Sequence, residues 1–201
     1  MGSVNTLIDS YKLNELLTKE KKSPFLDMKG RFRIFEKPKN GCQYVLGVDS
    51  AKGTGEHYST IQVLRVDSIK PIKVEQVATF ECNKTDLYHF ANIVNRVSIY
   101  YNHAYIMAEN NAEGWTVVSE LHWNYENGGL INTGNKTTDL GIRAKRGTKD
   151  NAVILMRKVI EGGLIELHDE RTITQLTDFT EKRNGTYSCE NLNDDLVTGL
   201  Y

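Results

Sequence analysis

The sequence predicts an α/β protein with a mixed sheet of five or more strands, flanked by helices and followed by an extra β-hairpin. Apolar, β-branched runs at 43–49, 59–66 and 72–80 are joined by short turn-like segments, as in an antiparallel meander. Beyond them, apolar segments of strand length alternate with segments of helical spacing. Asn184-Gly185, between two short strand-like runs, is a strong hairpin signal.

The first 30 residues are expected to form a helical and linker segment, with residues 31–201 as one domain. The start of the chain is polar with irregular amphipathic spacing, and a charge run followed by Pro24 ends its helix. Residues 31–35 alternate in polarity and predict a short edge strand.

Helices and strands alternate after the meander. The expected elements are a helix over 85–102, a strand over 104–109, a helix over 113–123, a short strand at 128–131, a helix over 149–161 capped by Thr148, a strand over 164–167, a helix over 170–176, a hairpin over 179–190 and a helix start over 191–197. Because a helix connects 43–49 to 104–109, the two strands can pair in parallel. Such pairing would place Asp49 and Glu109 side by side at matching strand ends.

Composition excludes several classes of protein. With 25 basic and 26 acidic residues the net charge is −1, so any nucleic-acid surface must be a local patch. Three widely spaced cysteines argue against a disulfide framework or a CxxC zinc site and fit a reducing, cytoplasmic setting. No apolar run is long enough to span a membrane, and no signal-peptide pattern is present.

Carboxylates stand where apolar runs stop: Asp49, Glu109 and the pair Asp194-Asp195. Two like charges at about 4 Å repel by about 4 kcal/mol at an effective dielectric near 20, so clustering these acids would cost stability. Bound Mg²⁺ or Mn²⁺ reverses that cost, because hard cations take several oxygen ligands. Two such ions can activate water and stabilise the leaving oxygen of a phosphodiester, which is nuclease chemistry.

Each acid also has a simpler explanation. Asp49 alone is typical of a turn or cap, and Glu109 of a solvated loop. Asp194 and Asp195 are typical of a helix start, where they favour the dipole. Adjacent helical residues point about 100° apart, so one of the two is expected to face a metal squarely.

Basic residues in a polar loop and on the hairpin are candidate contacts to DNA phosphates. They are Arg143, Lys145, Arg146 and Lys149 in the loop, and Lys182 and Arg183 on the hairpin. Their simpler explanation is solvated surface. The chain has no GxxxxGK[ST] phosphate loop, and its five histidines lack metal-ligand spacing. His57 is of interest because it lies across a glycine-rich turn from Asp49.

Several short stretches stand in a specific order. They are Arg33-Ile34-Phe35-Glu36-Lys37-Pro38; Val48-Asp49-Ser50-Ala51 with Gly53, Gly55 and Tyr58-Ser59; Met107-Ala108-Glu109-Asn110-Asn111 with Gly114; Gly141-Ile142-Arg143 with Thr148-Lys149; and Asn193-Asp194-Asp195-Leu196-Val197. Together they resemble the nuclease domain of the tailed-bacteriophage large terminase subunit, over roughly residues 30–201. Two positions depart from the family pattern: His57 stands where Asp is frequent, and Asn193 where His is frequent.

The resemblance implies an RNase H-like fold and a two-metal endonuclease that cuts concatemeric double-stranded viral DNA. It implies Asp49, Glu109 and Asp194 as catalytic metal ligands, Asp195 as a further ligand, and two Mg²⁺ or Mn²⁺ ions as cofactors. Implied partners are double-stranded DNA, the terminase ATPase domain, the small terminase and the portal protein, in the host cytoplasm. Because the chain has no ATPase motif, we expect an isolated nuclease domain.

Two other functions fit the same residues. One is another enzyme of the same fold, such as a junction resolvase; a sugar kinase would need a second glycine-rich phosphate loop, which the sequence lacks. The other is a non-catalytic DNA-binding or assembly module that retains the acids.

Overall fold

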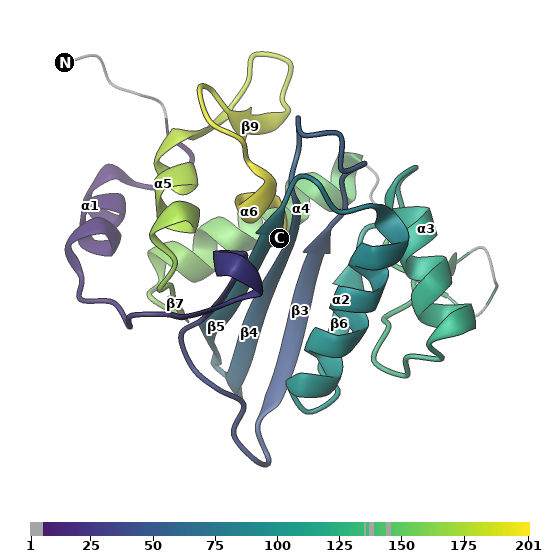
Figure 1. Cartoon of the computed structure of the whole chain (residues 1–201). Coiled ribbons are helices and arrows are strands. Elements are labelled where there is room, and N and C mark those ends of the chain that lie inside the picture. The colour runs from purple at the N-terminus through teal and green to yellow at the C-terminus, as the bar shows by residue number, and fades with distance from the viewer. Residues whose placement is uncertain (1–5, 135, 137–138, 144–145) are drawn as a thin grey trace.

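A computed structural model describes residues 6–134, 136, 139–143 and 146–201. In this part of the chain seven strands form one sheet in the order β1-β2-β5-β4-β3-β6, with β7 paired to β5 (Figure 1). Their bounds are β1 Phe25–Asp27, β2 Phe32–Ile34, β3 Gln43–Asp49, β4 Ser59–Ile69, β5 Ile72–Cys82, β6 Tyr105–Ala108 and β7 Ile165–Glu166. The predicted mixed sheet is confirmed.

The meander and the crossover are both as predicted. β3, β4 and β5 pair antiparallel, with Asp49 opposite Thr60 and Thr60 opposite Glu81. β6 pairs parallel with β3 in a register that sets Val48 beside Ala108. Asp49 and Glu109, each one residue further along, therefore follow neighbouring strands at the same end of the sheet.

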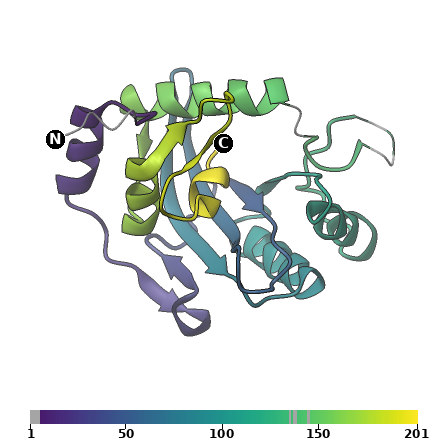
Figure 2. The same ribbon diagram turned by 90° about the horizontal axis from the view of Figure 1, so that it is seen from above.

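Helices cover both faces of this sheet (Figure 2). Their bounds are α1 Ser10–Thr18, α2 Leu87–Tyr100, α3 Gly114–Ser119, α4 Arg146–Glu161, α5 Glu170–Asp178 and α6 Asp195–Thr198, with a 3-10 turn at Met28–Gly30 and a π-helical turn at Glu120–Asn124. The alternate side chains Tyr44, Leu46 and Val48 of β3 pack into one core with α2 and α3. The intervening residues Gly47 and Asp49 face α6, on the opposite side.

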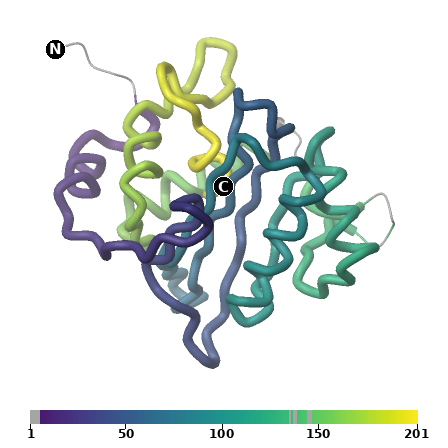
Figure 3. Tube along the Cα trace, in the orientation of Figure 1, coloured from purple at the N-terminus to yellow at the C-terminus, as the bar shows by residue number. Residues whose placement is uncertain are grey.

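A second apolar cluster joins α1, α4, α5 and α6. α1 lies beside α5 (Figure 3), and its buried Leu13 and Leu16 share this cluster with Ile173. The N-terminal segment thus packs on residues from the C-terminal half of the chain. A domain boundary near residue 30 stays a prediction.

Some element boundaries were wrong. α4 begins at Arg146, so Thr148 lies inside the helix and does not cap it. The strand predicted at the sheet edge is β2, but β1 pairs with its outer side and is the true edge strand. β1 was not predicted because its three residues are too few to show a polarity period.

The predicted hairpin is confirmed. β8 Phe179–Glu181 pairs with β9 Tyr187–Cys189 around Gly185, whose φ is +74°.

Glu75, on β5, is the centre of a buried ion network. Only 7% of its surface is exposed, and it forms salt bridges with Lys22 and Arg65 and contacts His168 Nε2 at 2.9 Å. Donor atoms of Glu75, Glu166 and His168 lie within 4.8 Å of one another, which is also a metal-like spacing. Because Lys22 and Arg65 already neutralise Glu75, we interpret the group as a tether between the N-terminal linker and the sheet.

Replacing Glu75 with Gln is expected to destabilise the protein by roughly 2–4 kcal/mol, because Arg65 and Lys22 then lose a buried partner. Urea unfolding at pH 7 measures the change. Glu166→Gln is the matched control, since its salt bridge to Lys19 is half exposed and is expected to contribute under about 1 kcal/mol. Equal stability of the two variants would contradict the tether.

Candidate metal centre

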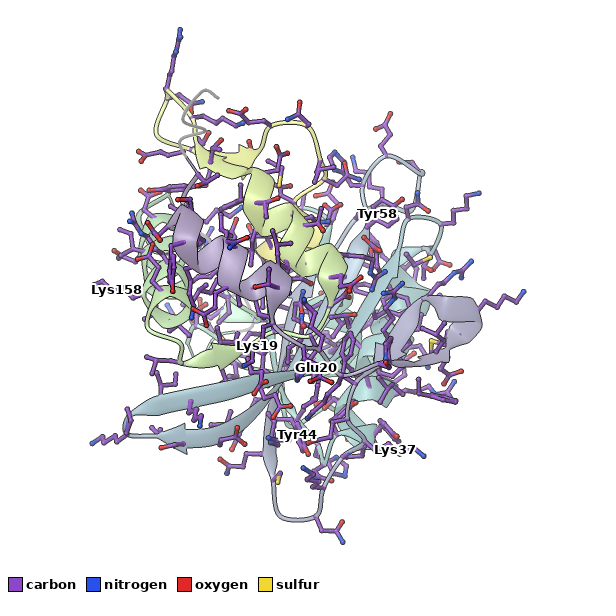
Figure 4. The ribbon with its side chains drawn as sticks, turned by 90° about the vertical axis from the view of Figure 1, so that its left-hand side faces the viewer. Lys19, Glu20, Lys37, Tyr44, Tyr58 and Lys158 are labelled. Carbon is purple, nitrogen blue, oxygen red and sulfur yellow. The ribbon has the colours of Figure 1, made fainter. Side chains whose placement is uncertain are left out.

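Three carboxylates lie at one end of the sheet, although their oxygen atoms are not all within 4.8 Å of one another. Asp49 is the last residue of β3, Glu109 follows β6, and Asp195 is the first residue of α6. The labelled Tyr58 marks this end of the sheet, and Tyr44 lies toward the other (Figure 4). Burial, with the negative charges of Asp195 and Glu109, raises the pKa of Asp49 to about 7.

Asp195 is held in place by the start of β4. The backbone N–H of Tyr58 donates to Asp195 Oδ2 at 3.0 Å, and Thr60 Oγ1 donates to the carbonyl oxygen of Asp195 at 2.8 Å. Only 6% of the Asp195 surface is exposed, and burial raises its pKa although the hydrogen bond from Tyr58 acts against the rise. The structure therefore keeps a second buried carboxyl beside Asp49, and among the described residues its one ion-pair contact is with the exposed imidazole of His57, 3.8 Å away.

The short helix α6 depends on polar side chains that sequence reasoning missed. Gln62 Nε2 donates to the carbonyl of Leu196 at 2.8 Å, and Gln175 Oε1 accepts from the N–H of Leu196 at 3.0 Å. Both glutamines are buried. A glutamine inside the apolar run of β4 was the signal available in the sequence, because a buried amide must find partners.

The adjacent acids Asp194 and Asp195 have different settings. The negative charge of Asp195 contributes to the raised pKa of Asp49. Asp194 is half-buried and directly precedes α6. Burial and the charges of Asp194, Asp49 and Glu109 raise the pKa of Tyr201 to about 12, so the Tyr201 phenol lies among these acids. No sequence motif marked Tyr201.

Two pockets meet at Asp49. One is lined by Asp49, Glu109, Lys149 and Tyr201 among others. The second, of about 340 Å³, is polar and includes Asp49, Asp195 and His57. Carboxylate oxygens are the donors that Mg²⁺ and Mn²⁺ prefer, so the acids at this junction fit a divalent cation.

The basic candidates are distributed unevenly. Lys149 Nζ lies 3.6 Å from Glu109 Oε2, so this lysine is at the acids themselves. Arg143 and Arg183 are exposed, and Lys182 donates to the carbonyl of Cys189 at 3.2 Å. Lys145 and the side chain of Arg146 lie outside the described residues.

The raised pKa of Asp49 predicts a pH dependence of stability in metal-free buffer. The folded protein keeps a proton on Asp49 up to about pH 7, whereas the unfolded chain releases it near its ordinary value of 3.8. This stabilisation is complete below about pH 4 and is lost as pH rises through about 7. Urea unfolding in EDTA should show that the free energy of unfolding falls more between pH 5 and pH 8 for wild type than for Asp49→Asn. An equal fall in the two proteins would contradict the raised pKa of Asp49.

No family model matches the sequence. Among solved structures, the large terminase nuclease from thermophilic phage G20c with bound magnesium aligns with a TM-score of 0.73 and 18% identity, covering 99% of this chain and 96% of that one. The nuclease domain of the Thermus phage P74-26 large terminase aligns with a TM-score of 0.63 and 19% identity, covering 94% and 91%. The chain has the fold of large terminase nuclease domains.

The expected RNase H-like mixed sheet with its additional hairpin is thereby confirmed as the fold. The P22 large terminase nuclease domain shares it more distantly, with a TM-score of 0.50 and 10% identity over 92% of this chain and 87% of that one. The G20c nuclease has also been solved with bound cobalt and with bound zinc. None of the helices in the described part of this chain combines the length and apolar character needed to cross a bilayer.

Proposed function

We propose that this chain is a metal-dependent endonuclease of the terminase type, which hydrolyses phosphodiester bonds of concatemeric double-stranded DNA. The observation that carries the proposal is the placement of Asp49, Glu109 and Asp195 at one end of the sheet, where they line two pockets that share Asp49. Gathering these charges costs stability unless a cation is bound. The fold shared with a magnesium-bound terminase nuclease supports the same function.

Asp49, Glu109, Asp194 and Asp195 would hold two Mg²⁺ or Mn²⁺ ions. When bound, such ions activate a water molecule and offset the charge that develops on the phosphodiester. The chain itself orients the ligands: Ser50 N–H holds Asp49 Oδ1 at 3.0 Å, as Tyr58 N–H holds Asp195. Lys149 supplies a positive charge beside Glu109, where a DNA phosphate would also approach.

The basic side chains would grip the DNA backbone. Their set is Arg143, Lys145, Arg146 and Lys149, with Lys182 and Arg183 on the hairpin. Such contacts make binding fall steeply with salt. Following the resemblance, we further propose that the domain from residue 31 works with a terminase ATPase domain, a small terminase and a portal protein in the host cytoplasm.

Cleavage of supercoiled and linear duplex DNA tests the proposal. We expect wild-type protein to cut both with Mn²⁺ or Mg²⁺ and to be inactive in EDTA. A strong preference for four-way junctions over linear duplex would favour a junction resolvase instead. Duplex binding without cleavage, and without metal uptake in calorimetry, would favour the non-catalytic module and overturn the nuclease.

A further inference from the structure

An apolar and basic surface lies at the edge of the sheet, and the proposed function does not use it. β1 is the edge strand and, in the described part of the chain, pairs only with β2. Two of its side chains are largely exposed, Phe25 at 62% and Leu26 at 54%. An exposed strand edge with apolar side chains is a template on which another chain can pair.

Beside β1 is a pocket of about 290 Å³, formed by β1, β2 and α2, which we call the edge pocket. Phe25 and Asp27 both line it, because alternate residues of a strand face the same side. Its apolar lining residues are Phe25, Met28, Phe32, Ile34, Val97 and Tyr100. A chain that lies along β1 could therefore place an apolar side chain in the edge pocket.

Positive charge surrounds the edge pocket. A neighbouring pocket, also of about 290 Å³, shares Met28 and Arg96 with it. The charged residues that line the two pockets are one acid, Asp27, and four cations, Lys29, Arg31, Lys37 and Arg96. Among the described residues, none of these cationic side chains has a hydrogen-bond or ion-pair partner. Because the whole chain has a net charge of −1, this local excess indicates an acidic partner.

The turn between β1 and β2 is held in an unfavourable backbone conformation. Met28, Lys29 and Gly30 have φ values of +49°, +61° and +81°, in a region that residues with a Cβ rarely adopt. Met28 packs against the main core, and its N–H donates to Asp27 Oδ1 at 2.6 Å. These contacts keep the rim of the edge pocket in one conformation, as a preformed binding surface requires.

We propose that this surface binds an extended acidic segment of a partner protein, which lies along β1 and inserts an apolar side chain into the edge pocket. β1 has only three residues, so backbone pairing supplies few hydrogen bonds and the apolar anchor and the charges supply most of the affinity. The cations would also attract duplex DNA, but a phosphate backbone would leave the apolar pocket and the strand edge unused. The proposal does not depend on the metal centre.

Fluorescence anisotropy of the whole chain with a labelled synthetic peptide tests the proposal. The probe has one Phe flanked by Asp and Glu residues and carries no basic residue. We expect saturable binding that weakens as salt is added. Arg96→Glu is expected to weaken it at least about tenfold, because a repulsive charge then stands between the two pockets. Phe25→Ser, or Ala in place of the Phe of the peptide, is expected to weaken it at least about fivefold.

Two matched controls change exposed side chains of the same kinds elsewhere. They are Lys158→Glu on α4 and Tyr11→Ser on α1. Lys158 and the surface residue Lys37 lie on opposite sides of the view in Figure 4. Both controls should bind the peptide like wild type. All four variants should melt like wild type, because each replaced side chain is exposed.

Three results would overturn the proposal. The first is the absence of saturable peptide binding to wild type, or equal binding by wild type, Arg96→Glu and Phe25→Ser. The second is that Arg96→Glu weakens binding of duplex DNA as much as binding of the peptide while Phe25→Ser changes neither, which would make the surface a DNA contact. The third is a wild-type dimer in sedimentation that Phe25→Ser abolishes, which would make a second copy of this chain the occupant.

Discussion

Replacing Asp49 with Asn is expected to lower the rate of DNA cleavage by about 10³-fold or more. Asp49 is the acid on which the charges of Asp195 and Glu109 converge, and we propose it as a central metal ligand. A bound cation supplies several kcal/mol of charge stabilisation in the transition state, and about 4 kcal/mol corresponds to about 10³ in rate. Single-turnover cleavage of a plasmid at saturating Mn²⁺ measures the loss.

The variant should remain folded, because the same change removes charge repulsion. In EDTA at pH 8, Asp49→Asn is expected to melt above wild type, and added Mn²⁺ should raise its melting temperature less. Glu20→Gln, in the exposed linker between α1 and β1, is the control for a lost acidic charge. A well-folded Asp49→Asn protein that cuts as fast as wild type would show that Asp49 is not a metal ligand needed for cleavage.

Replacing Gly47 with Ala is expected to impair both stability and cleavage. A Cβ at Gly47 would lie 1.9 Å from the carbonyl oxygen of Gly199, so α6 cannot stay where it is. Overpacking typically costs about 1–3 kcal/mol, and we expect the upper end of this range because backbone must move. Displacing Asp195 by about 1 Å is further expected to slow cleavage about 10²-fold.

Urea unfolding and single-turnover cleavage measure the two effects of Gly47→Ala. Gly128→Ala is the matched control, because no atom lies within 4 Å of its added Cβ and its backbone is not left-handed. We expect Gly128→Ala to match wild type in both assays. Wild-type stability and rate for Gly47→Ala would mean that the close approach of α6 to β3 is not required.

The sheet could be predicted from the sequence because its signals are local. The β-branched runs 43–49, 59–66 and 72–80 sit between short turns, and their antiparallel pairing follows directly. The parallel pairing of β6 with β3 follows from the helical crossover. These two results already place Asp49 and Glu109 side by side, so half of the candidate site was predictable from alternation and connection length.

The remainder of the site depends on long-range contacts. α6 has four residues, too few for a periodic signal, and its position is set by Gln62 and Gln175 from β4 and α5. Nothing local distinguishes Asp195, which faces Asp49, from its neighbour Asp194. Tyr201 follows α6 and lines the same pocket as Asp49 and Glu109, which is a contact between distant parts of the chain.

The proposed nuclease requires a cation bound at the end of the sheet where Asp49, Glu109 and Asp195 lie. A crystal soaked in Mn²⁺ and measured at the manganese absorption edge tests this most directly. We expect an anomalous peak at coordination distance, about 2.1 Å, from carboxylate oxygens of Asp49 and Asp195. A peak confined to Glu75, Glu166 and His168, or no peak at Asp49 and Asp195 in saturating Mn²⁺, would contradict the proposed metal centre.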